Sequence, residues 1–217
     1  MKCAFLRAGL GLALLCLSAC NAVLEGSGTP ASEVREVPAF SGVQIRDALV
    51  STVTVRPGEE ARVVLSGDDN LLPYVSTRVV EGVLVVEMTE PYFQREPLRA
   101  DITVPALGQL AASGTATVTA DGVSADLLRV STTGSAVVQA RGTAARLEVS
   151  ASGDSTIEAH ELSAEDVDVA GSEAAGVAVC ARARLALRLS GSSRTEYWCA
   201  PGTVTRALSG SARAEPR

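Results

Sequence analysis

Lysine, histidine and aromatic residues are scarce in this 217-residue sequence. The only lysine is Lys2, the only histidine is His160, and Phe, Trp and Tyr together make up 3% of the chain. From residue 20 onward, 17 arginines stand against 25 acidic residues, which gives a formal charge of −8. Because contacts to nucleic-acid phosphates need a net basic face, we expect no nucleic-acid partner.

With so few aromatic residues, the core must be built from Ala, Val, Leu and Ile, together with abundant Ser, Thr and Gly. Small and β-branched side chains suit closely stacked strands better than a helical bundle. The segments "DALVSTVTVRPG" (47–58) and "TRVVEGVLVVEM" (77–88) alternate apolar and polar residues with a period of two. This alternation predicts strands and an all-β protein.

The N-terminus lacks an apolar run long enough to span a bilayer. Lys2 and Arg7 precede ten apolar or small residues (8–17), which is the length of a secretory signal rather than of a membrane-spanning helix. The run ends in Leu17-Ser18-Ala19-Cys20, which resembles the bacterial lipobox. That resemblance implies cleavage before Cys20, acylation of Cys20, and an outer-membrane location because Asn21 follows. An ordinary signal peptide that happens to contain cysteine is the alternative.

Removal of residues 1–19 would leave only two cysteines that are not acylated. Cys180 and Cys199 would then lie in an oxidising compartment, where two thiols indicate one disulfide. Two buried free thiols are the alternative. If the pair bonds, the one-residue offset between the two positions requires a correction, which we expect from a bulge near Gly176.

The second half of the chain repeats a plain Ser/Thr-Gly motif about every 19 residues. The motif glycines are Gly114, Gly134, Gly153, Gly171, Gly191 and Gly210. Apolar residues precede each glycine by four and by two positions, except for Arg206 and Thr132. Val118, Val138 and Ile157 each stand four residues after a motif glycine. Periods of this length are typical of a solenoid, in which each coil buries its apolar face against its neighbours.

We therefore predict a right-handed β-helix-like solenoid of about 19–20 residues per coil, beginning near residue 105. Longer strands over 35–104 should pack on its N-terminal end, with turns at Pro57-Gly58 and Glu81-Gly82 and a short helix at 70–75. The alignment also places Arg129 and Glu148 at one outward position of adjacent coils, where opposite charges would meet.

Five segments of the chain resemble a known family. They are "VPAFSGVQI", "VTVRPGEEARVVLSGDDNLLPYV", "VVEGVLVVEM", "ITVPALGQLAASGTATV" and "LSGSSRTEYWCAPGTVTRALSGSARAE". Together they resemble the putative auto-transporter adhesin, head GIN domain family over about residues 35–215. Cys199 stands where that family more often has Gly. The resemblance implies an all-β, β-helix-like extracytoplasmic domain. The expected organisation is a signal peptide (1–19), a flexible Gly/Ser/Pro-rich tether (20–34) and one domain (35–217).

Few residues are candidates for chemistry. Glu158 and His160 share an outward face near Asp154, but no nucleophile accompanies them, so we expect no catalytic site and no enzyme activity. The "GDDN" motif (67–70) lacks calcium-loop spacing, and Asp68 or Asp69 should instead cap the short helix that follows. No metal or cofactor site is expected. Tyr92, Phe93 and Trp198 are weak candidates for binding a ligand, and core packing of one ring of each pair is the alternative.

The sequence thus favours a cell-envelope lipoprotein whose solenoid has a binding or structural role, with adhesion as one form of it. Its expected partners are a membrane, through the lipid anchor, and a surface protein or glycan. An enzyme acting on envelope glycans and a periplasmic sensor or accessory protein are the alternatives.

Overall fold

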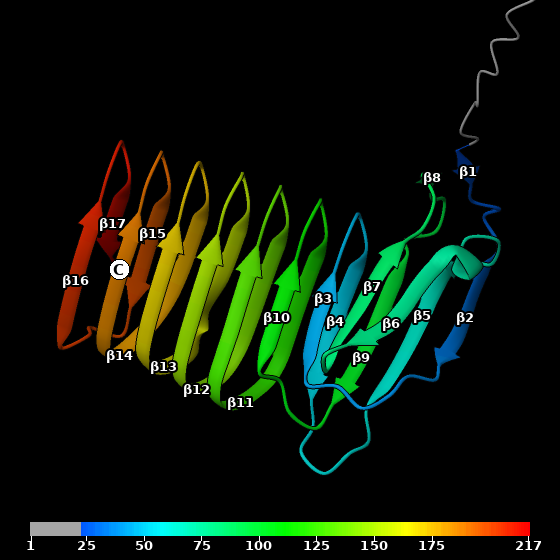
Figure 1. Cartoon of the computed structure of the whole chain (residues 1–217), viewed down its shortest axis with the longest axis horizontal. Helices are drawn as coiled ribbons and strands as arrows, with labels where there is room; N and C mark the ends of the chain where they lie inside the picture. The colour runs from blue at the N-terminus through cyan, green and yellow to red at the C-terminus, as the bar shows by residue number, and fades with distance from the viewer. Residues whose placement is uncertain (1–22) are drawn as a thin grey trace, which may run out of the picture.

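In the computed structural model, which describes residues 23–217, parallel strands follow one another along a single long axis (Figure 1). The only helix in that part of the chain is the short 3₁₀ helix η1 (Leu72–Tyr74). No helix within the described range is long and apolar enough to cross a membrane. The predicted signal peptide and Cys20 lie outside the described residues.

The repeated half is the predicted solenoid. Its strands are β10 (Gln109–Ala112), β11 (Thr117–Thr132), β12 (Val137–Ala151), β13 (Thr156–Gly171), β14 (Gly176–Leu189), β15 (Arg194–Trp198), β16 (Thr203–Leu208) and β17 (Arg213–Pro216). Each of β11 to β14 bends midway, so that its two halves belong to opposite sheets of the flattened coil (Figure 1). All of these strands pair in parallel with their neighbours in the stack.

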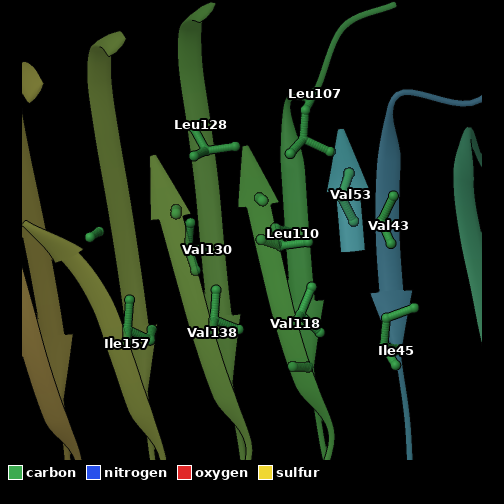
Figure 2. Packing of buried hydrophobic residues seen from close by; sticks show 14 of the residues in the cluster. Val43, Ile45, Val53, Leu107, Leu110, Val118, Leu128, Val130, Val138 and Ile157 are labelled. Carbon is green, nitrogen blue, oxygen red and sulfur yellow. The ribbon is translucent and has the colours of Figure 1, made fainter. Parts of the chain in front are cut away.

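Equivalent side chains form ladders inside the coils. Val118, Val138 and Ile157 pair in successive coils, are fully buried and lie at one level in Figure 2. On the outside, Arg129 pairs with Glu148, and its Nε lies 3.0 Å from the carboxylate. Both observations confirm the predicted register for these coils.

The fourth repeat is out of phase with the sequence motif. Gly171 was aligned with the corner glycines, but it pairs with Ala151 and Leu189 inside the sheet and is buried. Its missing side chain makes room for Leu189, whose Cδ2 would lie 2.9 Å from an added Cβ. Glu173 occupies the corner instead, with a φ of 59°, although left-handed backbone is uncommon for residues other than glycine.

The strands before residue 105 continue the two sheets rather than packing across their end. They are β3 (Gly42–Ile45), β4 (Val50–Val55), β5 (Arg62–Asp68), β6 (Val75–Val80), β7 (Val83–Met88) and β9 (Arg99–Val104), whereas β8 (Tyr92–Phe93) forms a separate two-stranded sheet with Leu24–Glu25. They are shorter than β11 to β14, contrary to expectation. The predicted turns are present, with a positive φ at Gly58, Glu81 and Gly82.

Stack order differs from chain order at this end. The β3–β4 coil turns at Asp47 and lies between the β7–β9 coil and the β10–β11 coil. Beyond β7 and β9 each sheet continues in an antiparallel strand: β6 beside β7, and β5 beside β9. In both sheets, the first strand beyond the coils therefore runs against the coil direction.

The expected flexible tether is wrong for the part that the structure describes. β1 (Leu24–Glu25) pairs with β8, and β2 (Pro30–Arg35) pairs antiparallel with β5 as an edge strand. The ordered body thus begins about ten residues earlier than predicted. The Gly/Ser/Pro composition misled because this segment takes its hydrogen bonds from partners about 28 to 70 residues away along the chain.

The "GDDN" motif holds this segment in place and does not cap η1. The carboxylate of Asp68 is fully buried and accepts backbone N–H bonds from Gly28 (2.6 Å), Arg95 (2.8 Å) and Glu96 (3.0 Å). Burial opposes ionisation of Asp68, but these three donors and the Arg95 charge outweigh it and lower its pKa. Asn70 bonds both Glu25 and Ser27 through its side-chain amide.

Candidate functional site

The disulfide between Cys180 and Cys199 is confirmed, with the two Cα atoms 5.2 Å apart. The expected bulge at Gly176 is wrong, because β14 and β15 pair without a shift from Gly176 to Cys180. Cys180 pairs with Trp198, and Cys199 follows with a φ of 72°. This left-handed residue turns the Cys199 side chain back toward β14, which corrects the one-residue offset.

Beside the disulfide, His160, which was considered for catalysis, contacts Trp198, which was considered for ligand binding. His160 on β13 and Trp198 on β15 flank β14, and their ring centroids lie 5.0 Å apart. β13 contains extra residues here, since pairing with β14 passes from Ala159–Val179 directly to Ser163–Cys180. His160 is the first of these extra residues. As the alternation predicts, the neighbouring Tyr197 is buried while Trp198 is partly exposed.

A groove crosses the outer face of β14 next to this His160–Trp198 pair. Gly176 and Ala178 point outward there and have almost no side chain, so they form the floor together with the backbone of Val177. Thr156 and Glu158 of β13 form one wall, and Arg194 and Glu196 of β15 form the other. The resulting cavity has a volume of about 220 Å³. We refer to it below as the β14 groove.

The two carboxylates of the groove are both engaged by neighbours. Glu158 accepts a hydrogen bond from the Gln139 amide at 2.9 Å. The hydrogen bond from Arg217 to Glu196 lowers the pKa of Glu196, against the opposing effect of burial. A general acid needs a raised pKa, so Glu196 is unsuited to that role at neutral pH. The groove offers a hydroxyl, carboxylates and a guanidinium, which are groups that bind polar ligands.

The other sequence candidates lie apart from the groove. Asp154 is exposed at the corner before β13, at the opposite end of that strand segment from His160. Tyr92 is half-buried against the core and Phe93 is 70% exposed, both on β8 at the N-terminal end. Burial and then the Asp47 charge raise the pKa of Tyr92. Within residues 23–217, no group of three or more His, Cys, Asp or Glu side chains could hold a metal ion.

Sequence reasoning missed Gly176, Ala178, Arg194 and Glu196 as site residues. The sequence did contain a signal for them. At two outward positions, β14 has the small residues Gly176 and Ala178, whereas the neighbouring strands have larger polar residues. These are Thr156 and Glu158 on β13, and Arg194 and Glu196 on β15. The phase error at Gly171 concealed it, because it displaced the neighbouring coil by two residues.

The fold and the groove together define an all-β solenoid with a recessed polar site on one outer face. The profile of the family described as putative auto-transporter adhesin, head GIN domain matches residues 39–201. The chain belongs to this family, as its sequence resemblance implied. No curated protein matches the sequence.

Solved structures show the same fold at low sequence identity. A putative adhesin from Bacteroides fragilis is 17% identical with a TM-score of 0.68, and the match covers 89% of this chain and 98% of that one. A putative adhesin from Parabacteroides distasonis is 15% identical with a TM-score of 0.63, covering 90% and 100%. A protein from the same species described as a putative lipid binding protein is also 15% identical, with a TM-score of 0.54 and the same coverage.

Proposed function

We propose that this protein is a cell-envelope lipoprotein, anchored in the outer membrane through acylated Cys20, whose solenoid binds an envelope or surface glycan in the β14 groove. The observation that carries the binding role is the groove itself, with its floor of Gly176 and Ala178 and the His160–Trp198 pair beside it. Membership of an adhesin family and the adhesin names of two structural neighbours support a role in adhesion.

The fold supports a defined orientation for such an anchor. Leu24 is four residues after Cys20, a stretch that reaches at most about 14 Å even when fully extended. Since Asp68 and Asn70 fix the segment that follows, acylation of Cys20 would hold the N-terminal end close to the bilayer. In the sheet that contains the groove, six strand steps lead from β5 through β9, β4, β11, β12 and β13 to β14, so the groove would lie about 29 Å along the axis from that end.

The pairing of Glu196 with Arg217 argues against Glu196 as a general acid and thus favours binding over catalysis. Glu158 and Glu196 stand on opposite walls, as the two acids of a glycoside hydrolase would, but Glu196 has a lowered pKa and is paired with Arg217. A hydrolase of that type needs one carboxyl group that remains protonated until it donates to the leaving group. We therefore propose that a glycan is held and not cleaved.

Two alanines of β14 provide a matched test of the groove. Ala178→Leu fills the floor, whereas Ala186→Leu adds the same side chain to the same strand on the opposite sheet. With the detergent-solubilised protein on a glycan array, we expect Ala178→Leu to weaken binding at least about tenfold and Ala186→Leu to leave it unchanged. Because Trp198 is the only tryptophan, its fluorescence should report the same ligands.

Two results would contradict the proposal. One is equal glycan binding by both leucine variants. The other is glycan hydrolysis that Glu158→Gln abolishes. The anchor is tested separately with a clickable palmitate, and Cys20→Ala should remove both the label and the membrane partitioning.

A further inference from the structure

Charge is distributed unevenly along the solenoid. Residues 176–217 contain seven arginines and two acidic residues, a net charge of +5. Residues 23–175 contain ten arginines and 23 acidic residues, a net charge of −13. The basic residues lie in the last coils, which include one wall of the β14 groove.

Within this basic region, two arginines occupy paired positions, and the charge of Glu196 acts on one of them, Arg194. Arg194 of β15 and Arg213 of β17 are register partners on the outer face, and both are exposed. Neither makes an ion pair within the described residues, while the neighbouring Glu196 is engaged by Arg217. Like charges directly opposite each other on adjacent strands are destabilising. This juxtaposition therefore has an electrostatic cost, which an anion bound between the two guanidinium groups would remove.

The space beside these two arginines suits an anion. They line a second cavity of about 230 Å³ with three serines, Ser192, Ser193 and Ser211. Guanidinium groups bind carboxylate, phosphate and sulfate oxygens through paired N–H donors, and hydroxyl groups can add a further donor. No carboxylate lines this cavity, so nothing in it repels an oxyanion.

We propose that Arg194 and Arg213 form a subsite for an oxyanion group on the ligand of the β14 groove. Arg194 lines both cavities, so the two lie side by side on the outer face. This inference rests on the proposed glycan-binding function and narrows it to acidic glycans, whose carboxylate, phosphate or sulfate would occupy the arginine pair. The ligand would then lie over β14 and extend across β15 toward β17.

An anionic membrane is the competing partner for a basic surface. The geometry disfavours it, because the proposed anchor holds the opposite end of the stack at the bilayer. In the sheet that contains the subsite, seven strand steps separate β5 from β15 and eight separate it from β17, a distance of about 34 to 38 Å. A headgroup would have to reach this subsite across the length of the solenoid.

The test compares two double variants that remove the same charge. Arg194→Gln/Arg213→Gln removes the subsite. Arg182→Gln/Arg188→Gln removes two exposed arginines of β14 that make no ion pair within residues 23–217 and line neither cavity. Binding of oligogalacturonate to the purified protein in neutral detergent is measured by calorimetry at two salt concentrations. We expect the first variant to lose about tenfold or more in affinity and the second less than about threefold.

A second readout is independent of any glycan. At equal ionic strength, inorganic phosphate in place of chloride should raise the Tm of the wild type and of the Arg182/Arg188 variant, but not that of the Arg194/Arg213 variant. Equal losses in both variants would mean general electrostatic attraction and would overturn the subsite, as would a wild type that binds neither oligogalacturonate nor phosphate. Stronger binding to phosphatidylglycerol vesicles than to oligogalacturonate would assign the basic surface to a membrane instead.

Failure of the subsite and failure of the proposed function are distinguishable. If neutral oligosaccharides bind, Ala178→Leu abolishes their binding and the Arg194/Arg213 variant behaves as wild type, the groove stands and the oxyanion subsite is wrong. If oligogalacturonate binding depends on the two arginines but is unaffected by Ala178→Leu, the subsite stands and the groove is wrong.

Discussion

At the N-terminal end of the stack the sheets finish in the antiparallel strands β6, β5 and β2, whereas at the C-terminal end they stop at the parallel strands β16 and β17. The first end is secured by non-covalent bonds to a buried carboxylate, Asp68. The second is secured by the Cys180–Cys199 disulfide. The two ends of the solenoid are thus stabilised differently, one by hydrogen bonds and the other by a covalent bond.

The difference teaches that a solenoid coil depends on neighbours on both sides. The strands of the β7–β9 coil are paired with other strands on both sides. β16, by contrast, has a neighbour on one side only among the described strands. Most residues of β16 are correspondingly exposed, including Leu208 at 43%. Because repeat proteins derive their stability from nearest-neighbour interfaces, we expect stability to fall toward the C-terminal end.

The largest expected effect comes from emptying equivalent core positions at the two ends. The exposed fraction is 0% for Leu84 of β7 and 1% for Leu187 of β14. Leu84→Ala should lower the free energy of unfolding by about 4 kcal/mol, and Leu187→Ala by about 2–3 kcal/mol, because the coil beside Leu187 can relax into the cavity. Urea unfolding measures both. A larger loss for Leu187→Ala would contradict the proposed gradient.

Next in size is the disulfide. It closes a loop of 19 residues, so Cys180→Ser/Cys199→Ser should lower the free energy of unfolding by about 3 kcal/mol. Hydrogen exchange should show the loss in β15, β16 and β17, while the amides of β7 and β9 keep their protection. If the amides of β7 and β9 lose protection equally, the two ends are not independent.

At the N-terminal end, Asp68→Asn should release the segment that contains β1 and β2. An amide can accept from fewer of the three backbone donors, and its own N–H₂ group would face one of them. A Glu-specific protease at pH 7 should then cleave after Glu33 in the variant but not in the wild type. Asp126→Asn, on an exposed residue of β11 whose side chain makes no hydrogen bond or ion pair within residues 23–217, is the control and should remain resistant.

Acid should have the same effect on the wild type. The pKa of Asp68 is lower in the folded protein than in the unfolded chain, so its stabilising contribution is complete above pH about 4 and is lost as the pH falls through the folded-state pKa. The Tm of the wild type should therefore fall more steeply below pH 4 than that of Asp68→Asn. Parallel Tm curves for the two proteins would contradict this assignment.

The smallest expected effect on stability concerns Arg206, which takes the inner ladder position of Leu187 in the next coil. Its guanidinium bonds the Tyr197 hydroxyl and lies 5.7 Å from the ring centroid. An inward charge discourages pairing at a free edge, so Arg206→Leu should self-associate at increasing concentration. Sedimentation velocity measures this, and Arg188→Leu, outward on β14, should remain monodisperse.

The sequence predicted the repeated coils far better than it predicted the ends. Glycine spacing and ladder alternation depend on contacts between residues about 19 positions apart, and these contacts recur from coil to coil. The predicted contact between Arg129 and Glu148 is therefore present. The error at Gly171 arose because a local Ala-Gly-Ser imitates the corner, while the actual corner, Glu173, lacks the expected residue type. The role of Asp68 depends on single partners 27 to 40 residues away, and no repeated pattern reveals those.

The position of the β3–β4 coil has a consequence for the order of assembly in time. Both of its neighbours in the stack, the β7–β9 and β10–β11 coils, come later in the chain. A chain that emerges N-terminus first therefore holds residues 42–55 without their full set of parallel partners until residues 83–121 have appeared. From β12 onward, each new coil instead meets a completed template. Folding should accordingly wait for one slow, long-range step near the N-terminus and then proceed by addition, coil by coil.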